Sequence, residues 1–288
     1  MNRGIDHLVL CVRDLDRARE AYAAFGFTTT PRAAHPFGTG NSLVQLQGNF
    51  LELLAVLDES QFPVTAANGF SFSAFSRDFL SRREGMSMLV FEGHGAEADR
   101  AEFAAKGLDT YDVFHFERKA TLPDGEEVTV GFSLTFVTHP AMPEAGFFTC
   151  TQHAPEYFWK PEYQDHPNGA RVVTEVVMTA EDPESFTTFF AALQGDEAVS
   201  ISDDALRVAT ARGQISVLTP DRFGERFGID PPGEDTPHFE AFRIAIVDPK
   251  RAEALLRDNS VPYRRRGESL QIGPGTAFGC VLELSPER

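Results

Sequence analysis

Cysteine and tryptophan are scarce in this chain of 288 residues, which contains three cysteines and one tryptophan. Cys11, Cys150 and Cys280 lie far apart, each in an apolar run typical of a strand, and no CxxC pair occurs. Such spacing favours neither a disulfide framework nor a cysteine-based zinc site. We therefore expect three buried thiols in a reducing compartment.

Long apolar runs are also missing, because no run approaches the ~20 apolar residues that a membrane-spanning helix needs. The opening sequence MNRGIDHLVL enters a strand-like pattern directly, without the basic and apolar regions of a signal peptide. A cytoplasmic protein with no membrane partner is expected.

Basic residues are outnumbered, with 26 Lys and Arg against 43 Asp and Glu, for a formal net charge of -17. A surface of this sign repels a phosphate backbone, so nucleic acid is not an expected partner. The chain also lacks the GxxxxGK[ST] and GxGxxG phosphate loops and the GxSxG turn of many hydrolases. Nucleotide and hydrolase chemistry are therefore not favoured.

What the chain does contain is a repeated order of elements. The strand-like run GIDHLVLCV precedes DLDRAREAYAAFGF, in which Asp14 is placed to cap a helix and Gly26 to end it. Two strand-like runs follow, NSLVQLQG and NFLELLAV. The same order returns after residue 171, with Asp182 before a proline at the helix start, and after residue 238, with Asp248 before a proline. A less distinct copy begins near residue 86.

Four βαβββ modules therefore fit the chain, at residues 3–57, 86–154, 171–220 and 238–285. One module leaves part of its sheet uncovered, so modules should pair. The expected fold is α+β, with two cup-shaped, mixed-sheet domains at 1–165 and 166–288. Neighbouring modules are the simpler pairs, and pairing of the first with the fourth is the alternative. Between modules, the phenylalanines of residues 58–85 predict a short helix over an apolar surface.

One carboxylate interrupts an apolar run. Glu52 lies within FLELLAV, residues 50–56, and Glu283 takes the same position when CVLEL is aligned with NFLEL. Burying an unpaired carboxylate costs several kcal/mol. Glu52 must therefore face water, meet a cation or lie opposite a hydrogen-bonding partner.

These motifs resemble the vicinal oxygen chelate superfamily of glyoxalase I, bleomycin-resistance proteins and extradiol dioxygenases, and within it the glyoxalase-like proteins of this length. GIDHLVLCVRDLDRAREAYAAFGF is similar to the first strand and helix of the family, and NFLELLAV to its fourth strand. FFTCTQHAPEYFWKPEYQDHPNGA is similar to the linking segment of the long glyoxalase-like members. The resemblance covers 1–57 and 146–195 well and is architectural elsewhere. It implies sheets curled into a cup that holds a divalent metal on side chains of first and fourth strands.

The matching positions in the first module are His7 and Glu52, which the resemblance implies are metal ligands. An imidazole and a carboxylate suit Fe(II), Mn, Ni or Zn. In the second module the first-strand position falls near Ser87. Its last strand offers Thr149 without a gap and, four residues on, His153 as the better donor. The expected metal set is His7, Glu52 and His153. The alternative is that the first two bond each other or water in an empty cup.

The C-terminal half has Glu175 and Glu283 at ligand positions but no histidine, which is a weak transition-metal set. We interpret this half as structural. Glu175 is expected to form an ion pair with one of three arginines: Arg171, Arg207 or Arg243.

The resemblance implies a metal-dependent lyase, isomerase or dioxygenase acting on a small oxygenated organic substrate, and no catalytic residue is identified. The alternative is a metal-free protein of the bleomycin-resistance type that binds or sequesters a hydrophobic molecule. The incomplete ligand set and the 26 phenylalanines favour the alternative. A small molecule is the expected partner, and a homodimer is left open.

Overall fold

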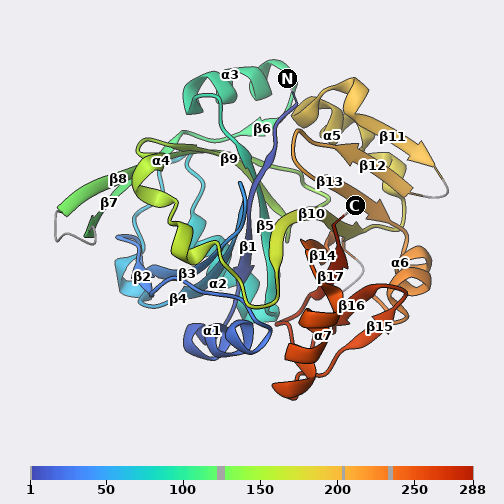
Figure 1. Cartoon of the computed structure of the whole chain (residues 1–288). Helices are drawn as coiled ribbons and strands as arrows, with labels where there is room; N and C mark the ends of the chain where they lie inside the picture. Colours follow the sequence, from blue (N-terminus) through green and yellow to red (C-terminus); the bar gives the residue numbers. More distant parts are fainter. Residues whose placement is uncertain (1, 122–126, 203–204, 233–235, 288) are drawn as a thin grey trace.

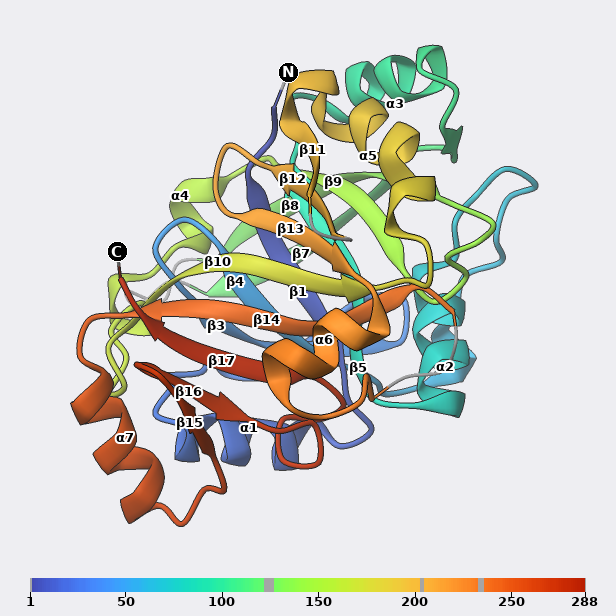
Figure 2. The ribbon, with the colours of Figure 1, turned by 90° about the vertical axis from the view of Figure 1, so that its right-hand side faces the viewer.

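The chain forms two mixed β-sheets, one from each half of the sequence, in a computed structural model that describes residues 2–121, 127–202, 205–232 and 236–287. The two halves stand side by side in Figure 1. Figure 2, turned by 90°, shows the second sheet in front of the first. Within these ranges no helix is long and apolar enough to cross a membrane.

The first sheet contains the strands of the first two modules. The first module comprises β1 (Ile5–Cys11), α1 (Leu15–Ala24), β2 (Ala33–Ala34), β3 (Thr39–Gln45) and β4 (Phe50–Val56). The second comprises β5 (Gly85–Glu92), α3 (Ala96–Ala105), β6 (Asp109–Thr110), β7 (Phe114–Thr121), β8 (Glu127–Thr138) and β9 (Gly146–Gln152). The strand order is β2-β3-β4-β1-β5-β9-β8-β6, and β7 pairs with β8.

The second sheet repeats this plan. The third module comprises β10 (Ala170–Thr179), η3 (Pro183–Phe186), α5 (Thr187–Gln194), β11 (Val199–Ser202), β12 (Ala205–Ala209) and β13 (Gln214–Leu218). The fourth comprises β14 (His238–Ile246), α7 (Pro249–Asp258), β15 (Arg264–Arg266), β16 (Ser269–Ile272) and β17 (Val281–Pro286). Its order is β11-β12-β13-β10-β14-β17-β16-β15. The predicted α+β fold of paired modules is confirmed, and neighbouring modules are the ones that pair.

The helix starts follow the capping residues in two of the four modules. Asp14 and Asp248 accept hydrogen bonds from backbone amides two and three residues ahead, and so cap α1 and α7. Asp182 precedes the 3-10 helix η3 and makes no side-chain capping bond. In the second module, Gly95 is the residue that precedes α3.

Alternate residues of a strand point to opposite faces of the sheet, and the two faces pack into different cores. In β1, Leu8 packs into a core shared by both sheets, whereas Val9 packs into the concave face of the first sheet. Phe147 belongs to the shared core, and its ring centroid lies 5.5 Å from that of Phe239 and 5.8 Å from that of Phe190. The sheets therefore pack against each other through one continuous apolar layer.

Each concave face is covered by an additional helix at the same point in the chain order. Helix α2 (Phe72–Arg82) comes between β4 and β5, and α6 (Pro220–Phe227) between β13 and β14. Phe79 of α2 packs into the first concave face, so the helix predicted within 58–85 is confirmed. Helix α6 was not predicted, and its Phe223 and Phe227 pack on Val177 of the second sheet. Short turns complete the chain: η1 (Glu59–Gln61), α4 (Pro155–Phe158), η2 (Pro161–Tyr163) and η4 (Asp196–Ala198).

Candidate functional site

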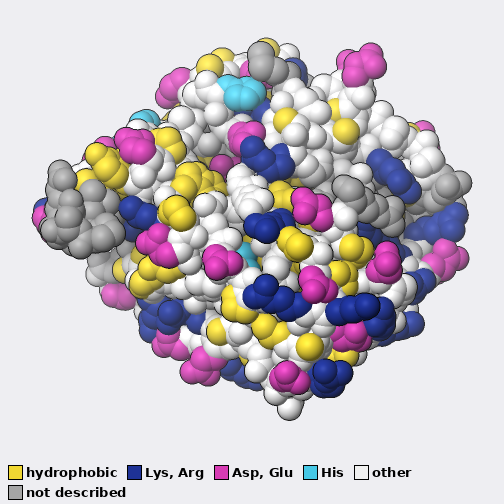
Figure 3. Space-filling model, in the orientation of Figure 1, with side chains coloured by type: hydrophobic (Ala, Val, Ile, Leu, Met, Phe, Trp, Pro, Cys, Tyr) yellow, Lys and Arg dark blue, Asp and Glu magenta, His cyan; other side chains and the backbone are white. Residues whose placement is uncertain are grey.

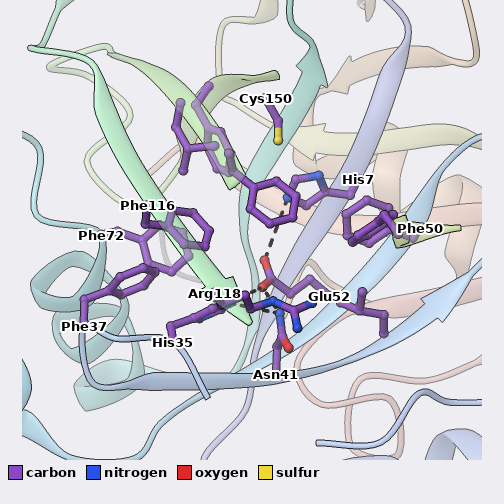
Figure 4. A pocket seen from close by; sticks show the side chains of 15 residues that line it. His7, His35, Phe37, Asn41, Phe50, Glu52, Phe72, Phe116, Arg118 and Cys150 are labelled. Carbon is purple, nitrogen blue, oxygen red and sulfur yellow. Dashed lines mark hydrogen bonds and ion pairs between the residues drawn. The ribbon is translucent and has the colours of Figure 1, made fainter. Parts of the chain in front are cut away.

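The concave face of the first sheet encloses a pocket whose wall is mostly aromatic (Figure 4). Seven of its fifteen lining side chains are phenylalanines, and the polar ones gather around Glu52. The free volume is about 50 Å³, below the roughly 300–1,000 Å³ of pockets that hold drug-sized ligands. A substrate larger than a few water molecules therefore requires some of the phenylalanine rings to move.

Glu52 of β4 is buried at the polar end of this pocket. The Asn41 amide donates a hydrogen bond to Glu52 Oε1 at 2.6 Å. His7 Nε2 lies 3.8 Å from Oε2, and His35 Nε2 lies 3.8 Å from Oε1. The charge inside the apolar run thus faces one amide and two imidazoles.

Both imidazoles turn Nε2 toward this carboxylate because Nδ1 is held elsewhere. His7 Nδ1 lies 2.5 Å from Asp6 Oδ1, and His35 Nδ1 lies 2.8 Å from Thr39 Oγ1. A carboxylate only accepts, so the neutral form of His7 carries its proton on Nδ1. Asn41 Nδ2 lies 3.2 Å from His35 Nε2, which selects the same tautomer. Each Nε2 lone pair therefore faces the pocket.

Aromatic rings fix the planes of the two imidazoles. His7 stacks on Phe50 with ring centroids 4.3 Å apart and an interplanar angle of 12°, and His35 stacks on Phe37 at 4.8 Å and 17°. Burial lowers the pKa of His35, and the charge of Glu52 only partly opposes this effect. His35 is therefore neutral at pH 7, which is the form that ligates metals.

The sequence pattern did not single out His35, because it lies outside the predicted strands. The histidine follows the two-residue strand β2, and its backbone N–H donates to the Thr39 carbonyl at 2.8 Å. The turn HPFGT folds the chain back beside the strand that pairs with β4. The proline and glycine of this turn were the available signal.

Strand register identifies the second-module positions that correspond to His7 and the glutamate. His7 pairs with Phe50 across β1 and β4, and Met88 pairs with Gly146 across β5 and β9. Met88 lies seven residues before Gly95, the residue that precedes α3, just as His7 lies seven residues before Asp14. Phe148 lies two residues after Gly146, just as Glu52 lies two residues after Phe50. The second module therefore presents a thioether and a phenyl ring at these positions.

The residues expected at these positions have other roles. The Ser87 hydroxyl lies 3.2 Å from Cys11 Sγ, and the Thr149 hydroxyl donates to Asp99 Oδ2 at 2.8 Å. The expected equivalence of Ser87 is corrected because α3 begins after Gly95, one residue later than the alignment assumed. That of Thr149 is corrected because Met88 pairs with Gly146, which places the equivalent position at Phe148.

The structure does not bring His153 to His7 and Glu52. Its side chain is exposed just past the end of β9, with Nε2 2.8 Å from Ser133 Oγ and its ring 5.4 Å from that of His115. Because β9 ends at Gln152, strand alternation no longer sets the direction of the next side chain.

Two further side chains set the electrostatics of the pocket. Arg118 of β7 contributes a positive charge; burial lowers its pKa, and the nearby Glu52 raises it. Burial, followed by the charges of Asp6 and Glu52, raises the pKa of Cys150 well above its usual value. Cys150 thus remains a thiol and is a poor nucleophile. All three cysteines are buried and free, as expected.

The donor set fits a divalent metal after one rearrangement. Among the residues that the structure describes, no group of three or more His, Cys, Asp and Glu side chains is already arranged around a metal position. Two ligands about 2.1 Å from one ion lie roughly 3–4 Å apart. Both distances from an imidazole to Glu52 are 3.8 Å. If the Asn41 amide turned away, His7, His35 and Glu52 would offer two imidazoles and a carboxylate, which suit Fe(II), Mn, Ni or Zn.

The concave face of the second sheet, the second cup, contains two carboxylates, Glu175 and Glu283, and both are in ion pairs. Arg226 donates to the two oxygens of Glu175 at 2.8 and 2.6 Å, and Arg243 Nη1 lies 3.3 Å from Glu175 Oε2. Arg243 Nε donates to Glu283 at 2.6 Å. Arg243 is one of the three expected partners, whereas Arg226 belongs to the unpredicted helix α6. Burial alone would raise the pKa of Glu175, but Arg226, Arg243 and the Ser216 hydroxyl lower it to about 2.

Comparison with known proteins gives a family and a fold. The model of a glyoxalase-like domain matches residues 5–194. A hypothetical protein from Staphylococcus aureus has 10% identity and a TM-score of 0.67, with 99% of this chain and 100% of that chain covered. A variant of 4-hydroxymandelate synthase from Streptomyces coelicolor has 13% identity and a TM-score of 0.58, covering 100% and 94%.

A fusion protein of a xylose isomerase-like TIM barrel and a 4-hydroxyphenylpyruvate dioxygenase has 11% identity and a TM-score of 0.57, with 99% of this chain and 49% of that chain covered. At these identities the structural likeness establishes the fold alone. No protein with a curated description matches the sequence.

Proposed function

Since the chain belongs to the family of glyoxalase-like domains, we propose that its first cup is the active site of a metal-dependent enzyme. The substrate would be a small oxygenated organic molecule, and the reaction of the lyase, isomerase or dioxygenase type. We assign His7, His35 and Glu52 as the residues that would hold a divalent metal.

The observation that carries this proposal is the convergence of two imidazole Nε2 atoms on one buried carboxylate. Hydrogen bonds from Nδ1 to Asp6 and Thr39 orient the rings, as outer partners commonly do for ligating histidines. A bound metal would supply Lewis acidity toward substrate oxygens. The phenylalanine wall would exclude water, and Arg118 would attract a negatively charged part of the substrate.

Elemental analysis by mass spectrometry tests the metal on untagged protein, after exposure to Fe(II), Mn, Ni or Zn. We expect a near-stoichiometric metal in the wild type and at least about a tenfold loss of metal affinity in His35→Ala and in Glu52→Gln. His153→Ala is the matched control and should retain the metal, because its side chain lies outside the pocket.

Absence of metal from the wild type under all four conditions would refute the proposal. Equal metal content in the wild type and both pocket variants would refute the assignment of ligands. Melting temperatures of all variants show whether each one is folded.

The alternative is a metal-free protein that binds a hydrophobic molecule. It is favoured by the Asn41 amide, which already bonds Glu52 at 2.6 Å, and by the aromatic wall. Under this alternative, Phe116→Ala should weaken the binding of an aromatic probe while His7→Ala leaves it nearly unchanged. Equal loss in both variants would argue against the alternative.

A further inference from the structure

We propose that the second cup binds the oxyanion group, a carboxylate or a phosphate, of a small molecule. Its pocket lies on the concave face of the second sheet beside α6. Among the residues that the structure describes, Glu175 is the only acidic side chain that lines it. Four of the nine lining side chains are arginines: Arg207, Arg222, Arg226 and Arg243. This inference does not depend on the function proposed for the first cup.

The gathering of positive charge contrasts with the negative net charge of the chain. The formal net charge is -17, and on the face shown in Figure 3 acidic and basic side chains are interspersed. Strand register produces the cluster, because Glu175 of β10 lies opposite Arg243 of β14, and Arg207 of β12 lies opposite Ser216 of β13. Helix α6 adds Arg226 from above the sheet.

The acidic residues of this cup do not neutralise it. Both oxygens of Glu175 are bonded to Arg226, and Glu283 is bonded to Arg243, so two carboxylates offset two guanidinium groups. Arg207 adds a further charge, and no hydrogen bond or ion pair of its side chain is found within the described ranges. The pocket therefore keeps a positive charge that faces solvent.

Two of the guanidinium groups, those of Arg226 and Arg243, are held in place before any ligand arrives. A guanidinium has five N–H donors, and the bonds of Arg243 to Glu283 and Glu175 use Nε and Nη1. Its Nη2 has no bonding partner in the described part of the chain. Planar guanidinium forks match the geometry of carboxylate and phosphate oxygens, which identifies the ligand class.

The second pocket also has more room than the first. Its free volume is about 380 Å³, compared with about 50 Å³ in the first cup. This value falls within the roughly 300–1,000 Å³ of small-molecule pockets. A small organic acid or phosphate ester can therefore enter without displacing the core.

Isothermal titration calorimetry tests the site with inorganic phosphate, pyrophosphate, succinate and citrate, against chloride at the same ionic strength. We expect saturable binding of at least one of these anions, and a comparison of phosphates with carboxylates identifies the preferred group. Arg207→Gln should weaken this binding at least about tenfold, equal to about 1.4 kcal/mol. Arg207 is exposed and outside the Glu175 network, so the variant should fold.

Two controls locate the binding. Arg257→Gln removes an arginine that is 70% exposed on α7 and should leave the affinity unchanged. Glu52→Gln in the first cup should also leave it unchanged. The proposal is overturned by the absence of saturable binding of all four anions, by equal weakening in both arginine variants, or by loss of binding in the first-cup variant.

Discussion

At the scale of single residues, the same position has different chemistry in different modules. Glu52 and Glu283 occupy equivalent places on β4 and β17, as the alignment of NFLEL with CVLEL predicted. Glu52 faces two imidazoles and an amide, whereas Glu283 accepts from Arg243 at 2.6 Å and from Gln271 at 2.8 Å. The partners around the carboxylate, and not its sequence position, distinguish a candidate metal ligand from an ion pair.

The Glu175 ion pair predicts a pH-dependent stability. Its pKa is about 2 in the folded chain and 4.5 without these partners, a difference of on the order of 3 kcal/mol. Because the folded value is the lower one, this stabilisation is present above about pH 4.5 and is lost as the pH falls toward 2. Urea unfolding should therefore show a large stability gap between the wild type and Glu175→Gln at pH 7 and a smaller gap at pH 3.

Glu162→Gln provides the comparison for this experiment, since Glu162 is exposed and forms no ion pair with any described residue. A gap for Glu175→Gln that is the same at both pH values would show that the ion pair contributes no pH-dependent stability.

The sequence pointed to part of the candidate site. The resemblance to the glyoxalase-like proteins selected His7 and Glu52, because both lie on strands whose pattern matches the family's first and fourth strands. His35 and Arg118 could not, because their approach depends on a turn and on the pairing of β7 with β8. For His153, the end of β9 at Gln152 decided the direction of the side chain, and strand ends are poorly defined by local sequence.

At the scale of elements, the two covering helices close the cups. Phe79 of α2 is 1% exposed and packs into the concave face of the first sheet. We expect Phe79→Ala to lower the free energy of unfolding by about 3–5 kcal/mol, because it removes a fully buried ring. Denaturant unfolding measures this loss.

Phe75→Ala is the matched control on the same helix, since that ring is only half-buried and should cost less. Equal losses of unfolding free energy in the two variants would show that the packing of α2 on the concave face does not stabilise the protein.

Helix α2 was predictable because its phenylalanines recur among polar residues, whereas α6 was hidden in a segment rich in charge. Four of the eight α6 residues, in PDRFGERF, are Asp, Arg or Glu, and only Phe223 and Phe227 are buried. Its place above the second cup follows from tertiary packing, which the local pattern does not encode.

At the scale of the whole molecule, one apolar core joins the two sheets. Phe147 is fully buried there, and its ring lies against Phe189, Phe190 and Phe239 of the other half. We expect Phe147→Ala to lower the stability of both halves by about 3–5 kcal/mol in total. Trp159 fluorescence follows the unfolding of the first cup, and far-UV circular dichroism follows the unfolding of both sheets. Because one core joins the sheets, we expect the two signals to change over the same range of guanidinium chloride concentration.

Val247→Ala is the control for this variant, because that side chain is 55% exposed and should have little effect. Two separated transitions in the wild type would show that the halves unfold independently. The domain boundary at residue 165 stays a prediction.

Because the modules differ in sequence, the two sides of the first cup differ in chemistry. The two equivalent positions of each module carry different pairs: His7 and Glu52, Met88 and Phe148, Glu175 and Ser216, Ala241 and Glu283. At these positions of the first cup one module thus contributes an imidazole and a carboxylate, and the module facing it contributes hydrocarbon and sulfur. We therefore expect the two ends of a bound molecule to meet different surroundings, with imidazoles, a carboxylate and an amide on the side of the first module, and phenylalanine rings and the Arg118 cation on the side of the second.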